Sequence, residues 1–131
     1  MADNNNSGGS SVRVTADGIA PGNLRHYWDD EFVQLLNANA SAANPEPLAD
    51  QLIGEISDEE IAAWSRGTPE DWVKESYGLA KDDPYMLLPL SELSTPHPLT
   101  KDYVEKATRT VHDQLMKAGI RLAAVLNEAL K

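Results

Sequence analysis

The feature that most constrains this fold is a long apolar repeat at the C-terminal end of the sequence. It predicts a single helix from Thr100, whose hydroxyl is a favourable N-cap, to about Leu130, roughly 45 Å at 1.5 Å per residue. Gly119 lowers the helix propensity there by about 1 kcal/mol, which favours a close crossing with another helix. A helix this long predicts the spine of a helical bundle. Its apolar stripe comprises Val104, Ala107, Val111, Leu115, Ala118, Leu122, Val125, Leu126 and Ala129.

Shorter amphipathic helices are predicted ahead of this spine. One begins at Asn23, a favourable N-cap, and others cover residues 48–56, 57–66 and 68–83. The helix over residues 57–66 starts with the Ser/Glu spacing of a capping box. Several prolines predict a loop over residues 87–99. The apolar stripe of the first helix comprises Leu24, Trp28, Phe32 and Leu35.

These patterns predict an all-α fold, a helical bundle of about five helices with a long C-terminal helix. A chain of 131 residues is long enough for one domain but not for two. We expect residues 21–131 to form the helical domain. Residues 1–20 are expected to be a flexible N-terminal segment, because residues 1–11 are rich in Asn, Ser and Gly. Residues 12–15 alternate over too few positions for more than a short extended piece.

Composition narrows the classes of function. The chain has 21 acidic and 11 basic residues, and its formal charge of −10 repels phosphate backbones. It contains no cysteine, so histidines and acidic residues are the remaining metal ligands. No run approaches the roughly 20 apolar residues of a membrane span, and the first residues lack the pattern of a signal peptide. We therefore expect no membrane contact and no export of the chain as written, and the compartment stays unknown.

Two polar pairs lie at helical spacing on the helix that begins after Asn23. Arg25 and Asp29, four residues apart, are expected at the edge of the apolar stripe, aimed partly inward. His26 and Asp30 are also four apart and are weaker candidates for metal binding, because a solvated surface pair explains them better. His97 and His112 have no partner at a recognisable metal spacing, and Asp113 is expected to point away from His112.

The residues around the first pair resemble a known family. Asn23-Leu24, followed by Trp28-Asp29, is similar to the signature Asn-Leu-His-x-x-Trp-Asp of the S-one/P-one nuclease family, which are single-strand-specific zinc nucleases related to zinc phospholipase C. The resemblance implies that Asp29 stands at a zinc-ligand position and that Arg25 replaces the family's His. Gly8, Gly9 and Ser10 resemble a degenerate copy of the Asp-x-Gly-Gly-Asn loop that cradles a nucleobase in the family, although a flexible polar tail is the simpler reading. Ser10 lacks the amide that would read a base edge.

Further matches extend the resemblance over nearly the whole chain. Two regions carry them, one from Trp64 to Tyr85 and one from Gln114 to Asn127. The second is the most specific, because Ala118-Gly119-Ile120-Arg121-Leu122-Ala123 is similar to the family's Ala-Gly-Val-Arg-Leu-Ala. Considered without the resemblance, the aromatic residues of the first region are expected in the core. The matched residues of the first region are Trp64, Trp72, Glu75, Ser76, Leu79, Ala80 and Tyr85.

The resemblance implies a zinc-dependent phosphodiester hydrolase that acts on single-stranded DNA or RNA and on 3′-nucleotides. Family members bind a cluster of zinc ions, and most of the ligands lie upstream of the signature, the last of them near Met1 or Ala2 at family spacing. One carboxylate does not hold zinc where catalytic sites use three protein ligands. We therefore expect no zinc cluster in this chain. Asp29 is expected to pair with Arg25, a contact worth about 0.5 kcal/mol if exposed.

Two functional hypotheses follow. The chain is the C-terminal portion of a zinc nuclease-like phosphodiester hydrolase that is inactive in isolation, or it is a non-catalytic helical module for interaction or self-association. The expected partner is a second copy of the chain or a missing N-terminal half, because exposed apolar surface seldom stays uncovered. Single-stranded nucleic acid, the family's substrate, is not expected to bind tightly. Family members are usually secreted or periplasmic.

Overall fold

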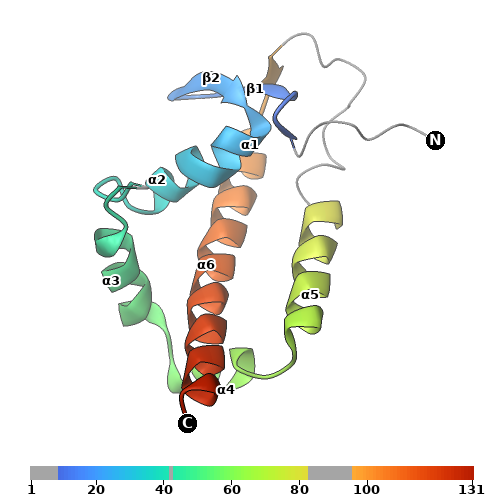
Figure 1. Cartoon of the computed structure of the whole chain (residues 1–131). Coiled ribbons are helices and arrows are strands. Elements are labelled where there is room, and N and C mark those ends of the chain that lie inside the picture. The colour runs from blue at the N-terminus through green and yellow to red at the C-terminus, as the bar shows by residue number, and fades with distance from the viewer. Residues whose placement is uncertain (1–8, 42, 83–95) are drawn as a thin grey trace, which may run out of the picture.

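The computed structural model describes residues 9–41, 43–82 and 96–131, and one long helix runs through them (Figure 1). This helix, α6 (Lys101–Ala129), lies between the N-terminal helical segment and α3 (Glu46–Glu55) on one side and α5 (Pro69–Asp82) on the other. The fold is mainly helical with the longest helix last, which confirms the predicted architecture. The short helix α4 (Asp58–Trp64) lies near the C-terminal end of α6 (Figure 1).

A small sheet, which the sequence analysis did not predict, covers the N-terminal end of α6. Strand β1 (Arg13–Ala16) pairs antiparallel with β2 (Ile19–Asn23), and β3 (His97–Pro98) pairs parallel with β1. The hairpin turn places Gly18 at a φ of 77°, a conformation that glycine adopts without strain. Strand β3 falls inside the predicted loop, because its pairing depends on β1, which is distant in sequence. The fold is therefore mainly helical, as predicted, but it also contains a three-stranded sheet.

The predicted boundary between residues 20 and 21 divides this hairpin. Val12 and Val14 lie in the segment that we expected to be flexible, yet both side chains are buried. Val14 is fully buried because β1 lies between β2 and β3. Residues 1–8 of the predicted flexible segment lie outside the described residues.

The helix that follows β2 contains a π-helical turn. Helix α1 (Leu24–His26) leads into η2 (Tyr27–Glu31) and then α2 (Phe32–Leu36). The Asn23 side chain accepts a hydrogen bond from the His26 backbone N–H at 2.8 Å, which confirms the predicted N-cap. The Phe32 N–H bonds to the Tyr27 carbonyl five residues back, so the turn holds one residue more than an α-turn.

The extra residue changes which side chains face the core. Tyr27 and Phe32, five residues apart, are both fully buried, whereas Leu35 is 53% exposed. Trp28 is only partly buried. The predicted stripe is therefore correct at Leu24 and Phe32 and wrong at Leu35, because one inserted residue shifts the helical phase by about 100°.

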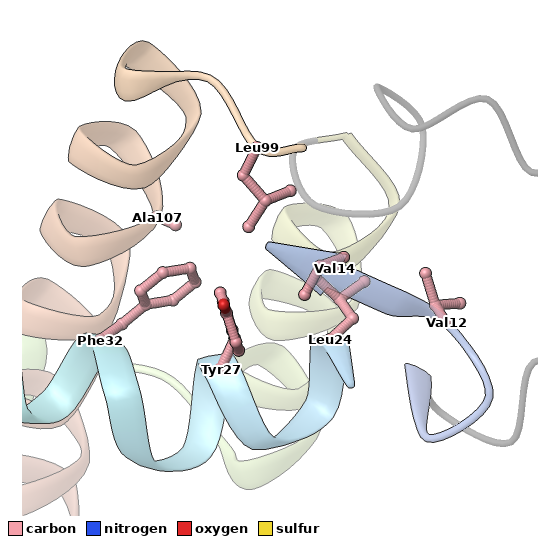
Figure 2. Close-up of a cluster of buried hydrophobic side chains, with 7 residues drawn as sticks. All are labelled: Val12, Val14, Leu24, Tyr27, Phe32, Leu99 and Ala107. Carbon is pink, nitrogen blue, oxygen red and sulfur yellow. The ribbon is translucent and has the colours of Figure 1, made fainter. Parts of the chain in front are cut away.

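The main hydrophobic core joins the sheet, the π-turn and α6. Figure 2 shows Phe32 pointing toward Ala107 of α6, with Tyr27 beside it, and their ring centroids lie 5.9 Å apart in an edge-to-face arrangement. The Tyr27 hydroxyl donates to the Ala20 carbonyl at 2.8 Å, so the one polar atom of this ring is satisfied. The core residues are Val12, Val14, Leu24, Tyr27, Phe32, Leu99 and Ala107.

A second, smaller core lies where α3 (Glu46–Glu55) meets α6. It comprises Ala40, Leu48, Leu52 and Met116. Helix α4 (Asp58–Trp64) follows, and Ser57 and Glu60 form the predicted capping box at its start. Gly67, at a φ of 89°, separates α4 from α5 (Pro69–Asp82). Most of the predicted loop over residues 87–99 lies outside the described residues.

Helix α6 agrees with its prediction in the first half and departs from it in the second. Thr100 accepts the Tyr103 N–H at 3.1 Å as its cap, and Ala107 is buried. Beyond residue 114 the buried side chains are Met116 and Ile120, whereas Leu122 and its predicted neighbours on the stripe are exposed. A Cβ added at Gly119 would meet nothing within 4 Å, so the crossing predicted there is not made inside the chain as described. No described helix is long and apolar enough to cross a membrane.

Candidate functional site

The structure brings the two predicted site segments together at the start of α1. The Leu24 backbone N–H donates to the Val12 carbonyl at 2.8 Å, and the Val12 N–H donates to the Gly9 carbonyl at 3.2 Å. The turn at Gly9 and Ser10 therefore lies beside the helix that carries Arg25. Gly9 has a φ of 88°, which fits a position that requires glycine. Gly8 lies outside the described residues, and base binding by this loop stays a prediction.

Arg25 and Asp29 form the expected ion pair but do not point inward. The Arg25 Nε lies 3.4 Å from the Asp29 Oδ2, and each side chain is 63% exposed. Asp29 lies within the π-turn, where the shifted phase turns it toward solvent. Exposed ion pairs of this kind contribute about 0.5 kcal/mol to the free energy of folding, so this pair stabilises the fold only slightly.

His26 contacts two carboxylates through opposite edges of its ring. Its Nδ1 lies 3.0 Å from Asp30 Oδ2, and its Nε2 lies 3.2 Å from Glu31 Oε1. One imidazole gives a single nitrogen to a given ion, so these two carboxylates do not converge with His26 on a common metal position. The geometry is that of a surface cluster, which is the reading that the sequence favoured.

Zinc requires more ligands than this region provides. Zinc sites in proteins use three or four Cys, His, Asp or Glu side chains. Among residues 9–41, 43–82 and 96–131, no group of three or more such side chains is arranged to hold a metal ion. Asp29 instead faces a guanidinium, which has no lone pair to offer. The described residues do not fit a zinc centre.

A cluster that joins α5 to α6 was missed by the sequence analysis, and we call it the Glu75 cluster. Glu75 Oε2 accepts from Arg121 Nη2 at 2.7 Å, and Glu75 Oε1 accepts from Lys117 at 3.0 Å and from Gln114 at 3.1 Å. Trp72 lies 5.4 Å from the Arg121 guanidinium, ring centroid to Cζ. The resemblance covers Trp72 and Glu75 in one region and Gln114 and Arg121 in another, and it gives no indication that they meet.

The Glu75 cluster holds its carboxylate ionised. Hydrogen bonding from Arg121 lowers the pKa of Glu75 from 4.5 to about 2, with further help from Gln114 and Lys117 against the opposing effect of burial. Arg121 is only 11% exposed and its Nε has no hydrogen-bond partner among the described residues, whereas Glu75 is 33% exposed. A carboxylate with these partners is a poor general base. The cluster therefore connects two helices, and its carboxylate is unsuited to act as a general base.

The expectation that Trp64 and Trp72 lie in the core holds in part, because Trp64 packs at the edge of the second core whereas Trp72 belongs to neither core. Both are partly buried, and each packs against a cation of the Glu75 cluster. Lys117 lies 5.9 Å from the centroid of the Trp64 ring. A signal in the sequence could have indicated this, because Lys117 and Arg121 are four residues apart and share one face of α6. Tyr85 lies outside the described residues.

His112 is more engaged than predicted. Its Nε2 lies 2.5 Å from Glu55 Oε2 at the end of α3, and its Nδ1 lies 2.9 Å from Asp113 Oδ1. The expectation that Asp113 points away was wrong, because the short carboxylate reaches back to the near edge of the ring. Hydrogen bonds to Asp113 and then Glu55 raise the pKa of His112 above 6.5. The contact fastens α3 to α6. His97, also treated as an ordinary polar residue, lies in β3.

Comparison with known proteins identifies the family. A family model described as S1/P1 Nuclease matches residues 1–131, the whole chain. No match was found among curated proteins or among solved structures. The helical fold and the residues quoted from the sequence agree with that match. The chain belongs to the S1/P1 nuclease family.

Proposed function

We propose that this chain is the C-terminal portion of a zinc-dependent, nuclease-like phosphodiester hydrolase, and that it is inactive by itself. The observation that carries the proposal is the family match over residues 1–131. The family implies a substrate with a phosphodiester bond in single-stranded DNA or RNA. The turn at Gly9, which the resemblance assigns to base binding, lies beside Leu24, at the start of the helical segment that carries Asp29.

The expected inactivity is supported by the ligand set. Arg25 occupies the position of the family's His, and its guanidinium pairs with Asp29 instead of leaving the carboxylate free. Asp29 is then the one family ligand that the sequence comparison finds, and catalytic zinc sites use three protein ligands. The formal charge of −10 further weakens the approach of a phosphate backbone.

The first prediction concerns hydrolysis. Purified chain mixed with zinc and single-stranded DNA is expected to release no more nucleotide than a metal-free control, because the ligands described here do not hold a zinc ion. Cleavage is measured by gel electrophoresis of an end-labelled oligonucleotide. Zinc-dependent turnover that disappears in an Asp29→Asn variant would contradict the proposed inactivity and show that the chain is an active nuclease.

The second prediction concerns Arg25, whose guanidinium we propose supplies the positive charge that a metal gives Asp29 in the family. Arg25→His creates two potential ligands four residues apart on one helical face, so we expect zinc binding that the parent chain lacks. Isothermal titration calorimetry with zinc measures the gain. The control is Arg25→His combined with Asp29→Asn, which should bind no better than the parent. No gain in the single variant would count against the idea.

A second candidate function, a non-catalytic module for self-association, is favoured by one observation. Leu122, Val125 and Leu126 form an exposed apolar row along the C-terminal half of α6. An exposed row of this kind is typical of a protein contact surface. The two candidates differ experimentally, because hydrolysis tests the first and the mass of the chain in solution tests the second.

A further inference from the structure

The His112 imidazole lies between two carboxylates that belong to different helices. Its Nε2 is 2.5 Å from Oε2 of Glu55, the last residue of α3, and its Nδ1 is 2.9 Å from Oδ1 of Asp113 on α6. A neutral imidazole carries one N–H and one lone pair, so it can donate to only one of the two carboxylates. Donating to both requires the imidazolium ion. The geometry is therefore that of a protonated histidine.

Glu55 is oriented toward His112 by a neighbour on its own helix. The Gln51 side chain donates to Glu55 Oε1 at 3.2 Å, which leaves Oε2 to accept from His112. Hydrogen bonds from His112 and then from Gln51 lower the pKa of Glu55 below 4.5, so this carboxylate is ionised wherever a histidine titrates. The other acidic residues of α3, Glu46 and Asp50, lie more than one helical turn before it.

The remaining charged groups near His112 come from α6. Glu105 and Arg109 line the same surface cleft as His112, and their opposite charges oppose each other in their influence on the imidazole. The α2 side of this cleft is formed by Leu35 and Leu36, which carry no charge. The two carboxylates within hydrogen-bond distance therefore decide the protonation of the ring.

The C-terminal end of α3 gains its positive charge from His112. A helix C-terminus carries a partial negative charge that a nearby cation stabilises, yet the last turn of α3 contains no basic residue. The protonated imidazole of His112 supplies that cation from the neighbouring helix. Its loss would remove a hydrogen bond and a favourable charge from the same place.

The last turn of α3 is less firmly packed than the rest of the helix. Helix α3 lies beside α6 (Figure 1), where Leu48 and Leu52 belong to the second core. In the last turn Ile53 is 69% exposed, and Gly54 has no side chain to pack. Neutralising His112 therefore weakens the attachment of this turn more than that of the helix as a whole.

We propose that His112 is a pH-sensitive latch, which holds the last turn of α3 against α6 when protonated and releases it when neutral. Hydrogen bonds to Asp113 and then to Glu55 raise the pKa of His112 above 6.5. The attachment is therefore fully present below 6.5 and is lost as pH rises through the raised, folded-state value. Ile53 in this turn lines an apolar groove of about 560 Å³ between α3, α4 and α6, so the latch positions one wall of that groove. The inference is independent of any hydrolytic activity.

Amide hydrogen exchange, resolved by residue with NMR, tests the release. Protection factors are calculated against the intrinsic exchange rate at each pH, so they report opening of the structure alone. Those of Ile53, Gly54 and Glu55 are expected to fall severalfold between about pH 5 and about pH 9, which spans the titration of a histidine. The amide of Phe32, in the main core, is the internal reference and should keep its protection.

Variants of His112 separate its charge from its other contacts. Lysine, with a pKa of about 10.4, stays charged over this interval, so His112→Lys should keep the last turn protected at alkaline pH. His112→Gln is never charged and should show low protection at both ends. His26→Gln is the matched control, because His26 also contacts two carboxylates, Asp30 and Glu31, but all three lie on one helical segment. It should behave like the parent chain.

The parent chain alone is enough to decide the proposal. Protection of the last turn that stays constant over the interval would overturn the latch, whatever the variants do. An equal loss of protection in the parent and in His112→Lys would also overturn it, because the charge at position 112 would then play no part. Circular dichroism at each pH checks that every variant keeps the helix content of the parent.

Discussion

Replacing Phe32 with alanine is expected to lower the free energy of unfolding by about 3–5 kcal/mol. Phe32 is fully buried, and its ring packs edge to face against both Tyr27 and Trp28. Removing it leaves a cavity at the junction of the π-turn and α6, where Ala107 is too small to fill the space. Urea denaturation followed by circular dichroism measures the change.

The matched control for Phe32→Ala is Leu35→Ala. A regular α-helix would bury both residues on one stripe, whereas the π-turn leaves Leu35 more than half exposed. We therefore expect Leu35→Ala to cost less than about 1 kcal/mol. Equal, large losses at both positions would show that the helix keeps α-helical phase and that the π-turn is absent.

Replacing Glu75 with glutamine is expected to cost about 2 kcal/mol near neutral pH. A drop in pKa from 4.5 to about 2 sets an upper limit of roughly 3.4 kcal/mol, and solvent around the partly exposed carboxylate reduces it. The change removes a charge that Arg121 and Lys117 share, leaving the largely buried guanidinium without its counter-ion. Thermal or urea unfolding of the two proteins gives the difference.

The effect of Glu75→Gln should depend on pH in one direction. The folded-state pKa of Glu75 is lowered, so its contribution is fully present above 4.5 and is lost as pH falls toward about 2. The difference between parent and variant should therefore shrink over that interval. Glu70→Gln on the same helix is the control, because Glu70 pairs with Lys74 on the exposed surface and should cost less than about 0.5 kcal/mol. A constant difference across the interval would contradict this account.

The helix starts of this protein were predictable from sequence because they depend on neighbours. Asn23, Ser57 and Thr100 each bond to a backbone N–H three residues ahead, as their residue types predict. The Arg25–Asp29 contact is equally local and was also predicted. The outward direction of this pair was not predicted, because it depends on the helical phase, which the π-turn changes.

The remaining features depend on residues that are far apart along the chain. Strand β3 forms through its pairing with β1, which lies far away in the sequence. The Glu75 cluster joins side chains that are 39 to 46 residues apart. The exposure of Leu35 was settled by the burial of Tyr27 and Phe32 in the main core, which fixes which side of the helix faces inward. Sequence by itself determined the family, the caps and the long helix, since local hydrogen bonds and periodicity suffice for these. Tertiary structure alone decided the sheet, the helical phase and the ion cluster, because each requires contacts that no local pattern encodes.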